Sequence, residues 1–355
     1  MTITATSAQG ALRIAAAAAV AFLSVSADAA AKVRAKPARR SQPAPAAQAQ
    51  PAALPSGGTY KLVPKVPGGI CCDPYVGAIS ADADTGRILF TDRADKKGYP
   101  ASVTKLMTVL LVVEDIEAGK YSFDDRAPAS QRAVSQEPSS VGLKLGQTMT
   151  IGDLCKSIMV KSANDAAVVL AEYAGLHGAG AVTPAPGAKP GQGGEYETFI
   201  ARMNARARQL GMDNTVYASA NGLPPKKDRR GKPLRDFDSS TANDLLKLAR
   251  EVVRHPQILE WTRLAKATVT DGSGNPLELY NHNNFLAGSK DTPKIPGCDG
   301  LKTGYTDAAG SSIILTATRN GRRAIVVVLS SAGRKLRDDN AGRLMLDALG
   351  AVSDW

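Results

Sequence analysis

The sequence predicts an α+β fold in which one antiparallel sheet is assembled from the two ends of a domain, with a long helical segment between them. Short apolar runs bounded by turn residues indicate two strands near each end. The second pair flanks Asn320-Gly321, a dipeptide typical of two-residue hairpins. A closing amphipathic helix is expected at Ala341–Leu349. The four expected strands are Tyr75–Ser80, Arg87–Phe90, Ser311–Thr318 and Arg323–Ser330.

Four helices are expected in the middle of the domain. Gly119 and Gly211 follow the first and third of them as C-terminal stops. Thr150 and Asp153 resemble a capping box at the start of the second. The Gly/Pro/Ala-rich stretch 176–194 is expected to be an inserted surface loop. The expected helices are Ser102–Glu117, Ile151–Tyr173, Tyr196–Leu210 and Ser240–Val253.

The chain of 355 residues is predicted to contain three segments. Residues 1–31 combine a basic residue, the apolar stretch 14–25 and small residues at the end, a pattern typical of a secretory signal peptide. Residues 32–67 are rich in Pro, Ala and Gln without periodicity, so they are expected to be a linker. Residues 68–355 form the folded domain. We therefore expect an exported protein of the periplasm or cell-wall space.

The net charge of +11 lies mostly outside the body of the domain. The linker holds seven basic residues and no acid, and the segment Lys226–Arg235 holds six basic residues and one acid. The rest of residues 68–355 is close to neutral. Nucleic-acid binding requires a basic folded surface, so it is not expected. We expect instead that the linker associates weakly with an anionic wall or membrane surface.

The cysteines and histidines predict no metal site, and no cofactor is expected. Cys71 and Cys72 are adjacent whereas Cys155 and Cys298 are distant, which permits three full disulfide pairings as well as free thiols. The histidines have neither i,i+4 spacing nor cysteine partners, so a zinc site is not expected. They are His177, His255 and His282.

The first candidate catalytic motif is Ser102-Val-Thr-Lys105. Residues three apart at the start of a helix share a face, so the Lys105 amine can reach the Ser102 hydroxyl. A serine needs a base to become a nucleophile. Lysine is such a base only when desolvation or a nearby cation lowers its pKa. The same tetrad in isolation is also compatible with an exposed capping serine and a solvated lysine.

Two further motifs follow. Ser162-Ala-Asn164 places polar residues within an apolar stretch, where they can interrupt a helix and direct a hydroxyl and an amide to one point. Lys302-Thr303-Gly304 places a cation and a hydroxyl at a strand edge, suited to a substrate carboxylate, with a glycine that permits close approach. An ordinary helix face and a basic turn are the alternatives for each motif alone.

Together and in this order, the three motifs resemble those of β-lactamases and penicillin-binding proteins. The longer stretches that carry them narrow the resemblance to the low-molecular-mass D-alanyl-D-alanine carboxypeptidases, serine peptidases of peptidoglycan. It extends from about Tyr75 to Leu349. The stretches are YPASVTKLMT (99–108), KSANDAAVVLAEYAG (161–175), FIARMNARARQLGMDNTVYASANGL (199–223), SSTANDLLKLAR (239–250) and GLKTGYTDAAG (300–310).

The resemblance implies a β-lactamase/transpeptidase-like fold, with an antiparallel sheet flanked by helices beside an all-helical subdomain. It implies that Ser102 attacks the carbonyl of the penultimate D-Ala to form an acyl-enzyme and that Lys105 accepts its proton. Ser162 would relay a proton to the leaving D-Ala. β-Lactams would acylate Ser102 as covalent inhibitors, and peptidoglycan stem pentapeptides would be the substrates.

Five positions are implied to bind substrate. Asn164 would hold the peptide, and Lys302 and Thr303 would bind its terminal carboxylate, next to Gly304. The backbone N–H groups of Ser102 and Tyr305 would form the oxyanion hole. A C-terminal β-rich domain, which some family members carry, is not expected before Trp355.

Three alternatives to the carboxypeptidase remain open at this stage. A DD-endopeptidase would use the same nucleophile on peptidoglycan crosslinks. A non-catalytic wall-binding protein would use the basic linker alone. A class A β-lactamase is disfavoured because a deacylating glutamate cannot be placed, Glu195, Glu197 and Glu251 being only candidates.

Overall fold

The computed structural model describes residues 74–178, 194–227, 230–233, 235–289 and 294–353. The predicted signal peptide and linker, together with Cys71 and Cys72, lie outside the described residues. Among the described residues, no helix is long and apolar enough to cross a membrane. The predictions of export and of an electrostatic linker therefore stay predictions.

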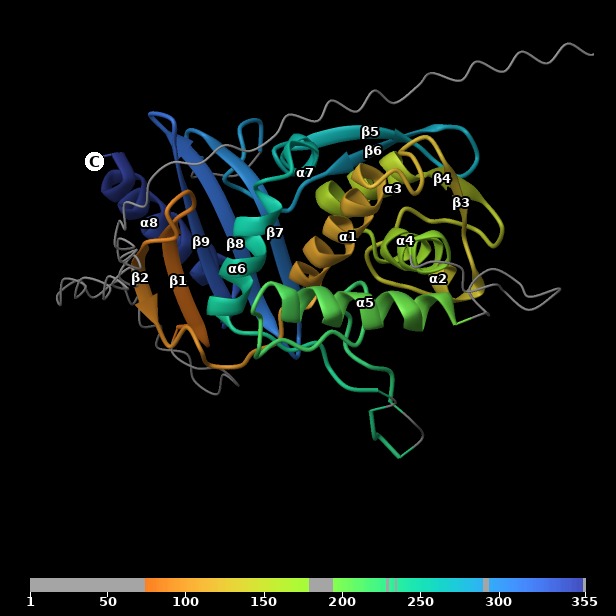
Figure 1. The fold of residues 1–355 in the computed structure, drawn as a ribbon, viewed down its shortest axis with the longest axis horizontal. Coiled ribbons are helices and arrows are strands. Elements are labelled where there is room, and N and C mark those ends of the chain that lie inside the picture. The colour runs from red at the N-terminus through yellow and green to blue at the C-terminus, as the bar shows by residue number, and fades with distance from the viewer. Residues whose placement is uncertain (1–73, 179–193, 228–229, 234, 290–293, 354–355) are drawn as a thin grey trace, which may run out of the picture. The chain divides into compact units, whose positions relative to one another are not determined.

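A five-stranded antiparallel sheet is the larger element of the fold, and it is built from both ends of the domain as expected (Figure 1). Its strand order is β2-β1-β9-β8-β7. The motif Lys302-Thr303-Gly304 was expected at a strand edge, and in the structure it lies in a strand of its own, β7. It pairs with β8 from Cys298 to Thr306 and is an edge strand of the sheet. The strands are β1 (Gly77–Asp82), β2 (Ile88–Asp92), β7 (Cys298–Thr306), β8 (Gly310–Arg319) and β9 (Arg322–Ser331).

Both faces of the sheet are buried because its side chains alternate between two cores. On β8, Ile313 packs into the cluster that includes helix α8 (Arg334–Ser353), and Ile314 packs into the larger cluster with α6 (Ala242–Val252). Helix α8 covers one face and α6 covers the other (Figure 1). The predicted closing helix is confirmed and is longer than its apolar pattern indicated, since α8 begins at Arg334.

The hairpin between β8 and β9 has the predicted geometry. Asn320 and Gly321 both have positive φ, at 51° and 76°. A two-residue turn with positive φ at both positions matches the right-handed twist of the flanking strands. The prediction from this dipeptide is therefore confirmed.

The helical part packs around α1 (Lys105–Glu117), which contacts five other helices and is buried along most of its length. The helical part also contains two antiparallel strand pairs, which the sequence did not predict. They are β3 (Arg126–Pro128) with β4 (Thr148–Thr150) and β5 (Lys266–Thr270) with β6 (Pro276–Tyr280). The remaining helices are α2 (Gln131–Val134), α3 (Ile151–Lys161), α4 (Asn164–His177), α5 (Glu195–Gln209) and α7 (Pro256–Thr262).

The prediction of one helix over Ile151–Tyr173 is wrong. The chain forms α3 and α4, separated at Ser162 and Ala163, because Ser162 adopts a left-handed conformation with φ of 63°. The N-terminal cap of the expected helix is confirmed: Thr150 Oγ accepts a hydrogen bond from the amide of Asp153 at 3.1 Å. The break lies at the polar motif that was expected to interrupt a helix.

Cys155 and Cys298 are free thiols in the structure. Cys155 lies in α3 and is fully buried, and burial raises the pKa of its thiol above the usual range. A buried thiol with a raised pKa is an inert core group.

The two cores make a stability prediction. Ile313→Ala and Ile314→Ala each remove a fully buried side chain from a different face of β8, so each is expected to lower the free energy of unfolding by about 2–5 kcal/mol. The exposed Arg319→Ala at the end of the same strand should change it by less than about 0.5 kcal/mol. Urea denaturation measures the free energy of unfolding of all three variants. An unchanged value for either isoleucine variant would contradict the burial of that side chain in its core.

Candidate active site

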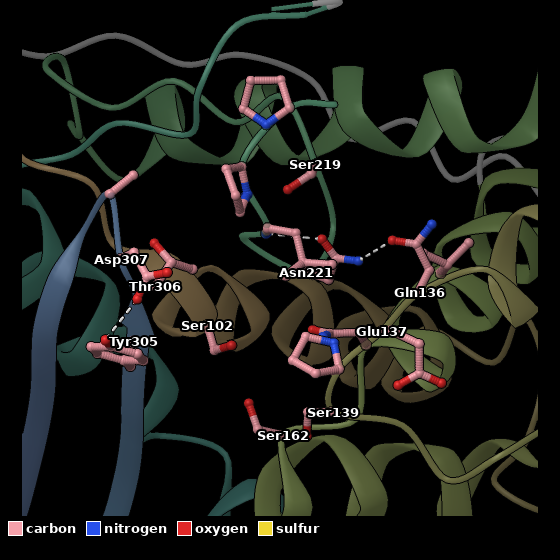
Figure 2. Close-up of a pocket in the computed structure, with 18 of the residues that line it drawn as sticks. Ser102, Gln136, Glu137, Ser139, Ser162, Ser219, Asn221, Tyr305, Thr306 and Asp307 are labelled. Atoms are coloured by element: carbon pink, nitrogen blue, oxygen red, sulfur yellow. Dashed lines mark hydrogen bonds between the residues drawn. The ribbon is translucent and has the colours of Figure 1, made fainter. Parts of the chain in front are cut away.

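A groove of about 1550 Å³ contains the sequence motifs. Ser102, Ser162 and Asn164 line it together with Thr303, Gly304 and Tyr305. Figure 2 shows Ser102 between the segment Tyr305–Asp307 and the pair formed by Asn221 and Gln136. The three motifs, which are separated by up to 200 residues in the sequence (Ser102 to Lys302), are thus brought to one place.

Ser102 lies in a single 3₁₀ turn, η1 (Ala101–Thr104), directly before α1. Ala101, the residue before it, has a positive φ of 49°. A left-handed conformation costs a non-glycine residue about 1–3 kcal/mol and persists only where surrounding contacts enforce it. The backbone is therefore held in a sharp turn that presents the Ser102 side chain to the groove.

Lys105 is the first residue of α1 and is fully buried. Its Nζ lies 2.8 Å from Ser102 Oγ, 2.7 Å from Asn164 Oδ1 and 2.8 Å from the carbonyl oxygen of Asn221. Three segments of the chain thus converge on one amine. The predicted contact between the serine and the lysine is confirmed.

Burial lowers the pKa of Lys105 well below its ordinary value, and the positive charge of Lys302 lowers it further. The carboxylates of Asp238 and Asp165 act in the opposite direction. We conclude that desolvation dominates, because the side chain has no contact with solvent. The amine therefore loses its proton more readily than an ordinary lysine does.

The break between α3 and α4 delivers Ser162 and Asn164 to the groove. The left-handed Ser162 ends α3, and α4 restarts at Asn164, whose amide oxygen accepts the hydrogen bond from Lys105. Figure 2 shows Ser162 and Ser139 on the wall of the groove opposite Asn221. A continuous helix would point residues 162 and 164 about 200° apart, so the break is required to bring both to one site.

Asp165 fixes the loop that forms part of this wall. Its buried carboxylate accepts hydrogen bonds from the amides of Val141, Gly142 and Leu143. The amide of Asn164 in turn donates to the carbonyl of Ser139 at 2.6 Å. Burial raises the pKa of Asp165 in spite of these bonds. The polar motif and the facing loop thus form one hydrogen-bonded unit.

A second buried carboxylate, Asp238, fixes the segment that supplies Asn221. It accepts hydrogen bonds from the amides of Ala218 and Ser219, at 2.6 Å and 2.8 Å. Gly222 has φ of 78°, and a Cβ there would lie 1.9 Å from the carbonyl oxygen of Ala101. Only glycine permits this approach, which brings the Asn221 carbonyl against Lys105.

Strand β7 forms the remaining wall. A Cβ on Gly304 would lie 2.6 Å from the carbonyl oxygen of Pro100 and 3.2 Å from the amide of Ser102, so the glycine lets β7 pack on η1, as the motif suggested. Tyr305 is half-exposed at 47%. The position of Gly304 therefore sets the distance between the strand and the serine.

Lys302 is nearly fully buried, and its Nζ donates to the carbonyl of its neighbour Thr303 at 3.0 Å. Burial lowers its pKa to about 7, with the charge of Arg337 as the second cause. Arg337 and Arg334 come from the start of α8 and line the groove. We call this the cationic end of the groove, where Arg337 is also paired with Asp338 at 2.7 Å.

All the predicted site residues lie in or directly behind the groove, and several contributors were missed. The Asn221 carbonyl, the two buried aspartates and the α8 arginines carry no motif of their own. The small residues Ser-Ala-Asn-Gly at 219–222 were the available signal for the Asn221 turn. Of the three glutamates considered for deacylation, Glu197 lines the groove and is paired with Arg132 at 2.9 Å.

A cluster outside the groove has the residue types of a metal site. Ligand-type atoms of Glu114, Glu251 and His255 lie within 4.8 Å of one another. Arg206 pairs with both carboxylates, at 2.6 Å and 2.8 Å. The cluster is therefore an ion-pair network between helices.

Sequence comparisons find D-alanyl-D-alanine carboxypeptidases among the relatives of this chain. The D-alanyl-D-alanine carboxypeptidase from Bacillus subtilis is 28% identical over 268 residues, which is 76% of this chain and 60% of the relative. One from Salmonella typhimurium is 30% identical over 270 residues, which is 74% of this chain and 60% of the relative. The chain thus spans about three fifths of the length of these relatives.

Solved structures with the same fold include penicillin-binding protein D2 from Listeria monocytogenes in its ampicillin-bound form. It has a TM-score of 0.60 and 31% identity, and the match covers 77% of this chain and 97% of that one. The D-alanyl-D-alanine carboxypeptidase from Francisella tularensis has a TM-score of 0.64 and 26% identity, with 80% and 72% covered. The predicted fold class is confirmed.

The family profile matches residues 76–180 and 190–333 and omits residues 181–189, which lie within the Gly/Pro/Ala-rich stretch. The two matched segments together cover most of the chain and include all three motifs. The chain belongs to the D-alanyl-D-alanine carboxypeptidase family.

Proposed function

We propose that the protein is a serine-type D-alanyl-D-alanine carboxypeptidase that removes the terminal D-Ala from peptidoglycan stem pentapeptides through an acyl-enzyme on Ser102. The observation that carries the proposal is the fully buried Lys105 amine, 2.8 Å from Ser102 Oγ in a groove that can hold a peptide. The family supplies the reaction class.

The contacts of Lys105 suit a neutral amine. A neutral primary amine has two N–H donors and one lone pair. Two of its partners, Asn164 Oδ1 and the Asn221 carbonyl, can only accept, whereas the Ser102 hydroxyl can also donate. When the amine is neutral and directs both N–H groups to the two obligate acceptors, its lone pair can accept the proton of the Ser102 hydroxyl. This is the arrangement that general-base activation of a serine needs.

In the acylation step, Ser102 Oγ attacks the carbonyl carbon of the penultimate D-Ala as its proton passes to Lys105 Nζ. The negative charge that develops on the carbonyl oxygen would be held by the backbone N–H groups of Ser102 and Tyr305. The C–N bond then breaks, and Lys105 returns the proton through Ser162 to the leaving D-Ala amine. Water hydrolyses the ester, which releases the shortened peptide and restores the Ser102 hydroxyl.

The cationic end of the groove would position the terminal carboxylate of the substrate. Thr303 offers a hydroxyl, and Lys302, Arg334 and Arg337 supply positive charge. A carboxylate at this point would place the preceding peptide bond over Ser102. Asn164 would then have two roles, as acceptor for Lys105 and as a contact for the peptide.

β-Lactams are expected to acylate Ser102, since the similar Listeria protein has been solved in ampicillin-bound and cefotaxime-bound forms. Export to the periplasm or wall space is part of the proposal and rests on residues 1–31. Weak association with the wall or membrane rests on the basic residues of 32–67.

Ser102→Ala tests the nucleophile directly. The parent should bind fluorescent penicillin covalently and release D-Ala from a stem pentapeptide, and Ser102→Ala should do neither. Ser135→Ala is the matched control, because Ser135 is an exposed serine of the same groove and should retain both activities. Gel fluorescence and D-Ala release measure the result.

Two outcomes would contradict the proposal. Labelling that survives Ser102→Ala would remove Ser102 as the nucleophile. A parent that splits crosslinked dimers and leaves pentapeptides intact would be an endopeptidase.

The pKa of Lys302 predicts how substrate binding depends on pH. Only the protonated ammonium attracts a carboxylate, and its pKa is about 7, so the KM for a pentapeptide should rise as the pH passes from 6 to 9. Lys302→Arg keeps its charge over this range and should flatten the rise. Steady-state kinetics separate KM from kcat, and a parent KM that is independent of pH would contradict this role.

A further inference from the structure

The basic segment at 226–235 has no role in the reaction proposed above, yet it reaches the same groove. Lys226, Lys227 and Arg235 line the groove together with Ser102. We propose that Lys226 and Lys227 form an anion subsite that recognises free carboxylates on the acyl side of the substrate, before its D-Ala-D-Ala end. The proposal rests on the proposed carboxypeptidase function and specifies the peptide that it prefers.

The segment is anchored at its base. Arg235, at the end of the segment, donates to the carbonyl of Leu223, which precedes the segment, at 2.6 Å. Lys227 pairs with Pro233 in an isolated β-bridge. Phe237 stacks on Tyr99 with 4.9 Å between ring centroids. The next residue is the buried Asp238, which also holds the Asn221 turn. The two lysines are therefore attached to the scaffold that positions the Lys105 amine.

The groove carries an excess of positive charge. Of its described lining residues, seven are Lys or Arg and three are Asp or Glu. Arg132 is already paired with Glu197, and Arg337 with Asp338 at 2.7 Å. Lys226 and Lys227 are exposed and have no carboxylate partner among the residues that the structure describes. Their charges are therefore available to a ligand.

The residues that precede the scissile bond form the acyl side of the substrate, and they point away from the cationic end of the groove. A terminal carboxylate at Thr303 and a scissile carbonyl at Ser102 leave the preceding residues to continue along the groove. Figure 2 shows Ser102 between the end of β7 and the segment that carries Asn221. Lys226 follows Asn221 by five residues in the sequence and lines the same groove. A groove of about 1550 Å³ exceeds the roughly 300–1000 Å³ of a small-ligand pocket, so it has room for those residues.

The test compares two isosteric peptides, N-acetyl-Glu-Glu-D-Ala-D-Ala and N-acetyl-Gln-Gln-D-Ala-D-Ala. At low ionic strength the parent should cleave the Glu-Glu peptide with about fivefold higher kcat/KM, the size expected for exposed charge pairs. The double variant Lys226→Gln/Lys227→Gln should bring the ratio of the two kcat/KM values close to one. It should leave kcat/KM for the Gln-Gln peptide unchanged. Added salt of about 0.5 M should have the same effect on the parent.

The adjacent exposed pair Lys96 and Lys97 provides the control, because it does not line the groove. Lys96→Gln with Lys97→Gln changes the net charge equally and should keep the preference. A parent that cleaves both peptides equally, or equal loss in the two double variants, would overturn the subsite. Release of D-Ala from neither peptide, with penicillin labelling absent, would overturn the carboxypeptidase itself and this inference with it.

Discussion

The site depends on one constraint: the Lys105 amine must lie beside the Ser102 hydroxyl in its neutral form. A protonated ammonium has no lone pair and could not accept the hydroxyl proton. Burying a charged ammonium costs several kcal/mol, so a fully buried lysine is neutral unless carboxylates compensate. Lys105 is completely buried at the start of α1, and this burial is the largest cause of its lowered pKa. Its contacts are a hydroxyl, an amide oxygen and a backbone carbonyl, none of them charged.

The surrounding segments are held by carboxylates that stay close to the amine without contacting it. Asp165 holds the loop at 141–143 and Asp238 holds the turn at 218–219, each through backbone amides. Both charges favour a protonated Lys105, whereas Lys302 opposes it. The hydrogen bonds of the two aspartates are directed to these amides and to the Ser219 hydroxyl, so the aspartates position the site. Desolvation is the largest cause of the lowered pKa of Lys105. Ala101 and Ser162, both left-handed, show where the backbone around the site is strained to complete this arrangement.

Local patterns predicted the sheet, the hairpin at Asn320-Gly321, the closing helix and the residues of all three motifs. These local patterns gave wrong or incomplete predictions where a contact between distant segments determines the backbone conformation. The stretch 151–173 has the composition of one helix, and only the meeting of Asn164 with Lys105 explains why it breaks at Ser162. The motif in β7 was expected at a strand edge, but the range of the strand was not predicted, because its glycines disfavour a strand until η1 packs against Gly304. The Asn221 carbonyl could not be foreseen, since any residue has one.

The protonation state of Lys105 can be measured directly. In protein labelled with ¹³C at lysine Cε, the chemical shift of Lys105 can be followed between pH 5 and 11 and assigned by its loss in Lys105→Arg. The account predicts a titration midpoint well below the ordinary value of 10.5. A midpoint near 10.5 would mean that the amine is an ammonium at neutral pH, and a different group would then have to activate Ser102.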